Sequence, residues 1–235
     1  MVYDYNLGGV NQLAAVIPST VPPGEYDVRV KNGAAVSAPF RTRVIPRKPG
    51  IVTADASGSG IAQATLEGKL ILQRNSVMGK IGVFDTRPAH PGDRMDLWGT
   101  GLGADVASDS GTGTSGDQTA AGQIRVLLNG VEIVPIYAGR SYGYPGLDQI
   151  AFTIPNNVAL KCDNAIQVRA GGTLSNLVTI ATSAPDATSC PASPPASGAC
   201  PPRANAGTTS TPTQAELNEW IASGQMCSGT FSISR

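Results

Sequence analysis

The chain has 235 residues, of which 41% are hydrophobic and 14% are charged. This length is enough for one or two cores, since domains usually have about 100 to 200 residues. The 17 basic and 17 acidic residues cancel, which argues against binding to nucleic acid or to an anionic membrane surface. No run of 18 apolar residues exists that could insert into a membrane. Twenty-eight Gly and 18 Pro favour short strands and turns, so an all-β fold is predicted.

Strand signals begin near the N-terminus. Residues 12–18 predict a strand that ends at a proline, and residues 22–24 predict a turn. Residues 26–30 alternate between apolar and polar side chains, which is the period of a half-buried strand. Asn32-Gly33 predicts a hairpin turn because both residues tolerate positive φ, and residues 36–44 are expected to return as the next strand.

The second half of the chain repeats this order. Two copies of one module are therefore predicted. Only the second copy is preceded by further strand signals, so the first is expected to begin in the middle of the module. The aligned pairs are residues 11–18 with 148–155, residues 28–30 with 166–168, and Ser37 with Ser175.

The second copy contains most of the predicted strands. Asn129-Gly130 and Gly171-Gly172 predict hairpin turns. Residues 45–49 predict a short stiff linker because proline fixes φ, and residues 104–122 predict an exposed loop. The candidate strands are residues 69–73, 81–84, 95–97, 124–128, 131–137, 148–154, 166–168 and 178–180.

Several motifs in a fixed order carry a family resemblance. The chain resembles a family of largely uncharacterised C-terminal domains of secreted bacterial proteins, similar to immunoglobulin-like IPT/TIG domains and often found in tandem. The resemblance covers residues 7–182 and implies Ig-like antiparallel β-sandwich modules at the cell surface or outside the cell, with no catalytic residues. The motifs are Asn11-Gln12 with Pro18, residues 49–53, Pro91-Gly92-Asp93 before residues 99–103, and Tyr137-Ala138-Gly139 before residues 145–150.

The predicted organisation has three parts. Residues 1–46 are a partial Ig-like module, residues 47–183 a complete one, and residues 184–235 a Pro, Ser and Cys-rich extension. A capping box predicts one helix at about residues 212–223. Its apolar face, with Trp220, is expected to pack on the second module or to contact a partner subunit.

Four cysteines lie in the last third of the chain, with no zinc-type spacing. Their even number beside Pro and Ser-rich sequence predicts disulfides and an oxidising compartment, with four free buried thiols as the alternative. The hairpin at Gly171-Gly172 places residue 162 opposite residue 182. Pairing of Cys162 with Cys190 and of Cys200 with Cys227 is therefore one connectivity, and Cys190 with Cys200 and Cys162 with Cys227 is the other.

No motif predicts a metal or a cofactor. His90 is the only histidine, which excludes a multi-histidine metal site and makes a catalytic triad improbable. Residues 99–103 are glycine-rich but lack the Lys and helix pattern of a phosphate loop, so a tight turn is predicted. Asp105, Asp109 and Asp117 could hold calcium, but a solvated loop is the simpler interpretation.

Aromatic residues are the candidate contact sites. Trp98, Tyr137, Tyr142 and Tyr144 could form a platform for a sugar or a partner, although packing of Trp98 inside the sandwich and capping of a loop by the tyrosines is the expected outcome.

The acid and base candidates Asp93, Asp96 and Glu132 show no pairing in the sequence that predicts an enzyme. We therefore expect a non-catalytic extracellular structural or adhesive protein. It is expected to be a fibre or surface subunit completed by strand pairing with other copies of itself or with a neighbouring extracellular protein. The alternative is a carbohydrate-binding or spacer module of a larger secreted protein, with glycans as partners.

Overall fold

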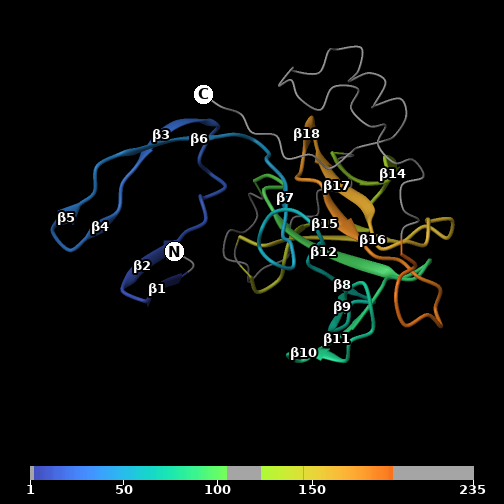
Figure 1. Cartoon of the computed structure of the whole chain (residues 1–235). Coiled ribbons are helices and arrows are strands. Elements are labelled where there is room, and N and C mark those ends of the chain that lie inside the picture. The colour runs from blue at the N-terminus through green and yellow to red at the C-terminus, as the bar shows by residue number, and fades with distance from the viewer. Residues whose placement is uncertain (1–2, 105–122, 145, 193–235) are drawn as a thin grey trace, which may run out of the picture. The chain divides into compact units, whose positions relative to one another are not determined.

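The computed structural model describes residues 3–104, 123–144 and 146–192, and the regular elements in these ranges are all β-strands (Figure 1). The predicted all-β class is confirmed for this part of the chain. None of these residues belongs to a helix of the length and apolarity that a membrane crossing needs. The chain divides into a unit of residues 1–191 and a unit of residues 192–235. The predicted helix at 212–223, Trp220, Cys200 and Cys227 lie outside the described residues.

Residues 3–44 form three separate two-stranded sheets, with pairs β1-β2, β3-β6 and β4-β5. The predicted strand 36–44 is interrupted at residues 37–39, since Pro39 has no N–H to offer a ladder. The strands are β1 (Tyr3–Leu7), β2 (Val10–Ala14), β3 (Gly24–Val28), β4 (Lys31–Asn32), β5 (Ala35–Val36) and β6 (Phe40–Val44).

An eight-stranded sheet follows, with the order β10-β11-β9-β8-β12-β16-β15, and β7 also pairs with β12. Its strands pair antiparallel, except that β9 and β11 are parallel. The strands are β7 (Gly50–Ile51), β8 (Ala64–Leu66), β9 (Ile71–Gln73), β10 (Lys80–Ile81), β11 (Phe84–Arg87), β12 (Arg94–Thr100), β15 (Tyr137–Arg140) and β16 (Asp148–Thr153).

A five-stranded antiparallel sheet has the order β14-β13-β17-β18, with β19 also paired to β17. Its two predicted tight turns are confirmed. Asn129 and Gly130 have φ of 50° and 80° and join β13 to β14, and Gly171-Gly172 joins β17 to β18. The strands are β13 (Ile124–Leu128), β14 (Val131–Ile133), β17 (Asn164–Ala170), β18 (Thr173–Leu174) and β19 (Val178–Ile180).

Both larger sheets contribute to one hydrophobic core. Alternate residues of β13 and β17 are buried, as period-2 patterning requires when one face of a sheet is covered. The buried side chains come from the eight-stranded sheet at Ile51, Ala64, Leu66, Met95, Leu97, Ala138, Ile150 and Phe152, and from the five-stranded sheet at Ile124, Val126, Leu128, Ile166, Val168, Ala170, Val178 and Ile180.

Other predicted strands also differ in their extent. Residues 81–84 form a hairpin turn in which Ile81 lies opposite Phe84, because Gly82 adopts a φ of 62°. Residues 131–137 divide between β14 and β15, which belong to different sheets. Pro135 lies between them and cannot donate to a continuous ladder.

The C-terminal end of the described chain is tied to the body of the protein. Cys162 and Cys190 form a disulfide with a Cα–Cα distance of 5.1 Å, which is the first pair of the first predicted connectivity. Ser189 forms a β-bridge with Ser76, and the Cys190 N–H donates to the Asn75 carbonyl at 2.9 Å. Ordered pairing therefore continues past residue 183, into the segment that the sequence assigns to the extension.

Candidate functional site

Ser37 and Ser175 make the same hydrogen bonds in two places. The Val30 N–H donates to Ser37 Oγ at 3.0 Å, and the Ser37 N–H donates to the Val30 carbonyl at 2.9 Å. The Val168 N–H donates to Ser175 Oγ at 2.9 Å, and the Ser175 N–H donates to the Val168 carbonyl at 2.8 Å. Each hydroxyl then donates to the carbonyl of the next residue. Each serine thus closes the ladder where the register shifts by one residue, as at a β-bulge.

The strand registers around the two serines also agree. Each hairpin of residues 24–44 has a counterpart in residues 162–182, displaced by a constant number of residues. Lys31 opposite Val36 corresponds to Arg169 opposite Leu174, and Val28 opposite Phe40 corresponds to Ile166 opposite Val178.

The β1-β2 hairpin corresponds in the same way to β15-β16. Tyr3 lies opposite Ala14, as Tyr137 lies opposite Ala151. The connection between the strands is shorter in the first hairpin, where residues 8–9 replace residues 141–147. The residues that align in the sequence therefore hold equivalent places in two sets of strands. The first set is β1 to β6, within residues 3–44, and the second set is β15 to β19, within residues 137–180.

The two sets differ in the strands that pair with their edges. In the second set, β16 pairs with β12 and β17 pairs with β13. Among the described residues, β2 pairs only with β1, and β3 pairs only with β6. Each of these two strands therefore has one open edge.

Burial follows this difference in pairing. In the second set, five core residues are exposed by 2% or less: Ile150, Ile154, Ile166, Val168 and Val178. Their counterparts in the first set are 48–73% exposed: Leu13, Ile17, Val28, Val30 and Phe40. We call these five residues the uncovered core positions.

The hairpin that contains Val28 and Phe40 has an apolar side and a charged side. On its other side, Arg41 pairs with Glu25 at 2.8 Å and with Asp27 at 3.3 Å. These ion pairs are exposed, so each stabilises the hairpin by about 0–1 kcal/mol. The hairpin thus has one charged side suited to water and one apolar side on which Val28 and Phe40 are 48% and 73% exposed.

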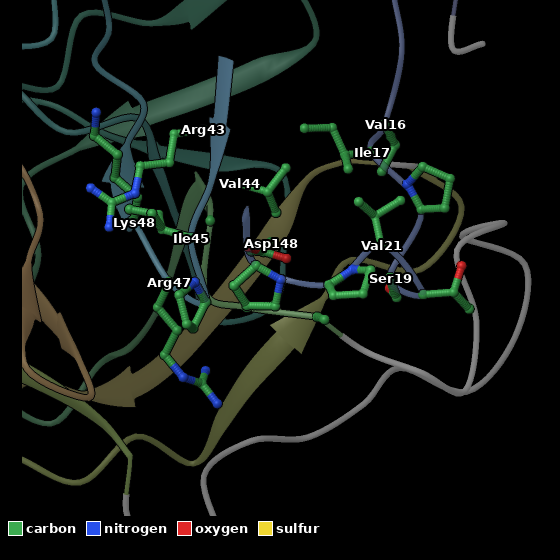
Figure 2. A pocket seen from close by; sticks show the side chains of 18 of the residues that line it. Val16, Ile17, Ser19, Val21, Arg43, Val44, Ile45, Arg47, Lys48 and Asp148 are labelled. Carbon is green, nitrogen blue, oxygen red and sulfur yellow. The ribbon is translucent and has the colours of Figure 1, made fainter. Parts of the chain in front are cut away.

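A pocket of about 580 Å³ lies beside the first set of strands. Figure 2 shows the basic residues Arg43, Arg47 and Lys48 on one side and the aliphatic Val16 and Val21 on the other. The remaining lining residues are Ile17, Pro18, Ser19, Thr20, Pro22, Pro23, Val44, Ile45, Pro46, Gly101, Gly103, Ala104, Arg140 and Asp148.

Several polar groups of this pocket form hydrogen bonds with residues far away in the sequence. Arg47 donates to the Leu102 carbonyl, and burial lowers the pKa of its guanidinium. The Leu102 N–H donates to Asp148 Oδ2 at 2.9 Å, and Arg140 donates to Ser19 Oγ at 3.2 Å. These bonds join residues far apart in the sequence, so the geometry gives the pocket a structural role.

The predicted aromatic contact residues are not equivalent. Trp98 and Tyr137 are half-buried, and the Tyr137 hydroxyl donates to the Arg140 carbonyl at 2.7 Å. Trp98 alternates along β12 with buried Leu97, so it lies on the face opposite the shared core. Trp98 is therefore not one of the residues of the shared core. Tyr142 and Tyr144 are 75% and 66% exposed.

The acid and base candidates are held in separate places. Asp93 accepts hydrogen bonds from Arg87 and from the His90 N–H, and these bonds hold residues 90–93 in a turn. Burial and the positive charge of Arg87 lower the pKa of His90, while Asp93 opposes the shift. Asp96 accepts from Arg94 at 3.0 Å, and Glu132 pairs with Arg169.

Among the residues that the structure describes, no three His, Cys, Asp or Glu side chains group closely enough to hold a metal ion. The calcium candidates Asp105, Asp109 and Asp117 lie outside these residues.

The glycine-rich motif has a packing role that its spacing did not reveal. Gly99 lies in β12 and pairs with Ile51, so the motif begins inside a strand. A Cβ on Gly101 would overlap the carbonyl oxygen of Lys48. The glycines therefore let the linker cross close to β12.

Comparison with known proteins adds no assignment. No protein-family model, no curated protein and no solved structure matches the chain. The uncovered core positions and the open edges beside them are the candidate functional site.

Proposed function

We propose that this is a non-catalytic extracellular structural or adhesive protein whose first strands are completed by another chain. In this proposal residues 47–183 are a complete Ig-like β-sandwich, and residues 1–46 are the C-terminal half of a second one. The observation that carries it is the contrast between the uncovered core positions and their buried counterparts.

The energetics favour a cover for the first set. A two-stranded hairpin is at best marginally stable alone, and an open edge with apolar side chains is prone to pair with other chains. Fully burying one large aliphatic or aromatic side chain stabilises by about 1.5–3 kcal/mol. Because the uncovered core positions are only half-exposed on average, covering all five stabilises by roughly 5 kcal/mol.

One observation supports an extracellular setting, and another supports two related modules. The Cys162–Cys190 disulfide is the kind of bond that persists in oxidising compartments. The repeated hydrogen bonds at Ser37 and Ser175 support two related modules in one chain, an arrangement that the resemblance to tandem domains of secreted bacterial proteins also implies.

The test is the mass of the unreduced chain by light scattering after size exclusion, with negative-stain images of the same fraction. We expect polymers or regular fibres. Val28→Glu should reduce the mass to that of the monomer, whereas Val83→Glu, at an exposed turn position, should leave it unchanged. A well-folded monomer whose first strands are protected from hydrogen exchange would contradict the proposal.

Glycan binding is a second candidate function, favoured by the exposed pair Tyr142 and Tyr144. Exposed tyrosines offer an apolar face and a hydroxyl to a sugar ring. A glycan array should then show binding that is lost in the Tyr142→Ala, Tyr144→Ala variant, and an array without any binding would remove this candidate.

A further inference from the structure

We infer that the partner of the first set is an extended strand with alternating apolar and acidic side chains, which pairs antiparallel with the open edge of residues 27–32. This inference rests on the proposed function and specifies its partner. Three observations carry it: the direction of the backbone groups, the register of the second set, and the charges beside the edge.

The backbone directs specific groups to the open edge. The N–H and carbonyl of Val30 both bind Ser37. Because successive residues of a strand direct these groups to opposite edges, Arg29 and Lys31 direct theirs to the open edge. In the second set, the equivalent edge pairs with β13. Just beyond the end of β13, the Ala165 carbonyl accepts a hydrogen bond from the Asn129 N–H at 2.8 Å.

The second set supplies the register. Val126 lies opposite Val168, and Leu128 lies opposite Ile166. Since Val30 and Val28 are the counterparts of Val168 and Ile166, the donor strand should place apolar residues opposite them. The side chains of both valines are 48% exposed, which leaves room for such contacts.

The charges beside the open edge indicate which donor residues should alternate with the apolar ones. Residues 25–31 and 41–43 carry four basic side chains, Arg29, Lys31, Arg41 and Arg43, and two acidic ones, Glu25 and Asp27. The donor residues opposite Arg29 and Lys31 should therefore be acidic, because opposite charges across a strand pair attract.

The chain's own β13 does not meet this requirement. It places Arg125 opposite Arg169, the counterpart of Lys31, and Leu127 opposite Gln167, the counterpart of Arg29. Pairing of β13 with the open edge would set Arg125 against Lys31, and like charges directly opposite are unfavourable. The edge thus favours an acidic donor over a copy of β13.

The test uses two labelled peptides with the sequence of residues 123–129, in which Arg125 and Leu127 are both replaced by Glu or both by Lys. Each is titrated into the unreduced full chain, diluted to the monomer, and followed by fluorescence anisotropy. We expect the Glu peptide to bind about tenfold more tightly than the Lys peptide at low salt, with the difference shrinking as salt is raised.

Two readouts locate the peptide. Val30→Glu should abolish binding, whereas Leu174→Glu, an exposed position in the second set, should not affect it. Hydrogen exchange should slow at the amides of Arg29 and Lys31 and change little at Val30, whose N–H already binds Ser37.

The outcomes separate this inference from the proposed function. Equal binding of both peptides, or binding without protection of Arg29 and Lys31, overturns the inference. A chain that forms polymers but binds neither peptide overturns the inference and leaves the proposed function standing. A monomer that binds neither peptide overturns both, and a monomer that binds the Glu peptide in the expected place supports the inference while contradicting self-assembly.

Discussion

At the scale of single residues, Gly101 shows that a glycine-rich motif similar to a phosphate loop can serve chain packing instead. Its φ of 82° and its closeness to Lys48 leave no space for a Cβ. The Lys48 N–H also donates to the Gly101 carbonyl at 2.9 Å, so the linker is bonded to this position. The need for glycine comes from the approach of another segment, which the spacing of the motif does not encode.

Gly101→Ala should therefore destabilise the protein by at least about 2 kcal/mol, since the left-handed backbone alone costs about 1–2 kcal/mol and the overlap adds to it. Gly130→Ala is the control. Gly130 has a φ of 80° but nothing within 4 Å of a built Cβ, so only the backbone term applies. Urea denaturation of both variants measures the difference, and equal midpoints would contradict the packing role of Gly101.

At the scale of elements, Ser37 and Ser175 occupy matching bulges with different surroundings. Ser175 is 7% exposed and Ser37 is exposed. Removing a hydroxyl in the buried hairpin leaves the Val168 N–H without its acceptor, whereas water can replace the hydroxyl in the exposed hairpin. The same local sequence pattern should thus have two energetic consequences.

Ser175→Ala should lower the free energy of unfolding by about 1–3 kcal/mol, the usual penalty for an unsatisfied buried donor. Ser37→Ala should lower it by about 0.5 kcal/mol or less, as is usual at the surface. Denaturant unfolding of the monomeric chain compares the two. If Ser37→Ala destabilised as much as Ser175→Ala, the first hairpin would already be covered within the single chain.

At the scale of the whole molecule, the disulfide joins the end of the described chain to the core. Cys190 is 5% exposed and is separated from Cys162 by 28 residues. Closing a loop of this size stabilises a protein by about 3–4 kcal/mol in the chain-entropy model.

The Cys162→Ala, Cys190→Ala double variant should lose that amount in urea denaturation. Substitution tests this bond alone, whereas a reductant would also act on any bond of Cys200 or Cys227. A variant as stable as the parent would show that the β-bridge at Ser76 and Ser189 suffices to hold this segment.

Much of the local structure could be predicted from the sequence. The candidate strand at residues 124–128 matches β13, and the repeat of residues 28–30 at 166–168 predicted the centre of β17. The Asn129-Gly130 pair predicted a hairpin turn, and counting from Gly171-Gly172 placed Cys162 near Cys190. These features depend on backbone preferences and on the two-residue period of a strand, both of which act over a few residues. The breaks within residues 36–44 and 131–137 were missed although each contains a proline, because the apolar pattern continues across it.

What only the tertiary structure decided is which apolar positions become core. Val28 and Ile166 belong to matching patterns, yet one is half-exposed and the other is fully buried. The pattern determines that a strand has an apolar side, whereas burial requires a second layer from distant residues. In the second set, side chains from both larger sheets bury these positions in one shared core. In the first set no described strand buries them, and this difference is the basis of the proposed function.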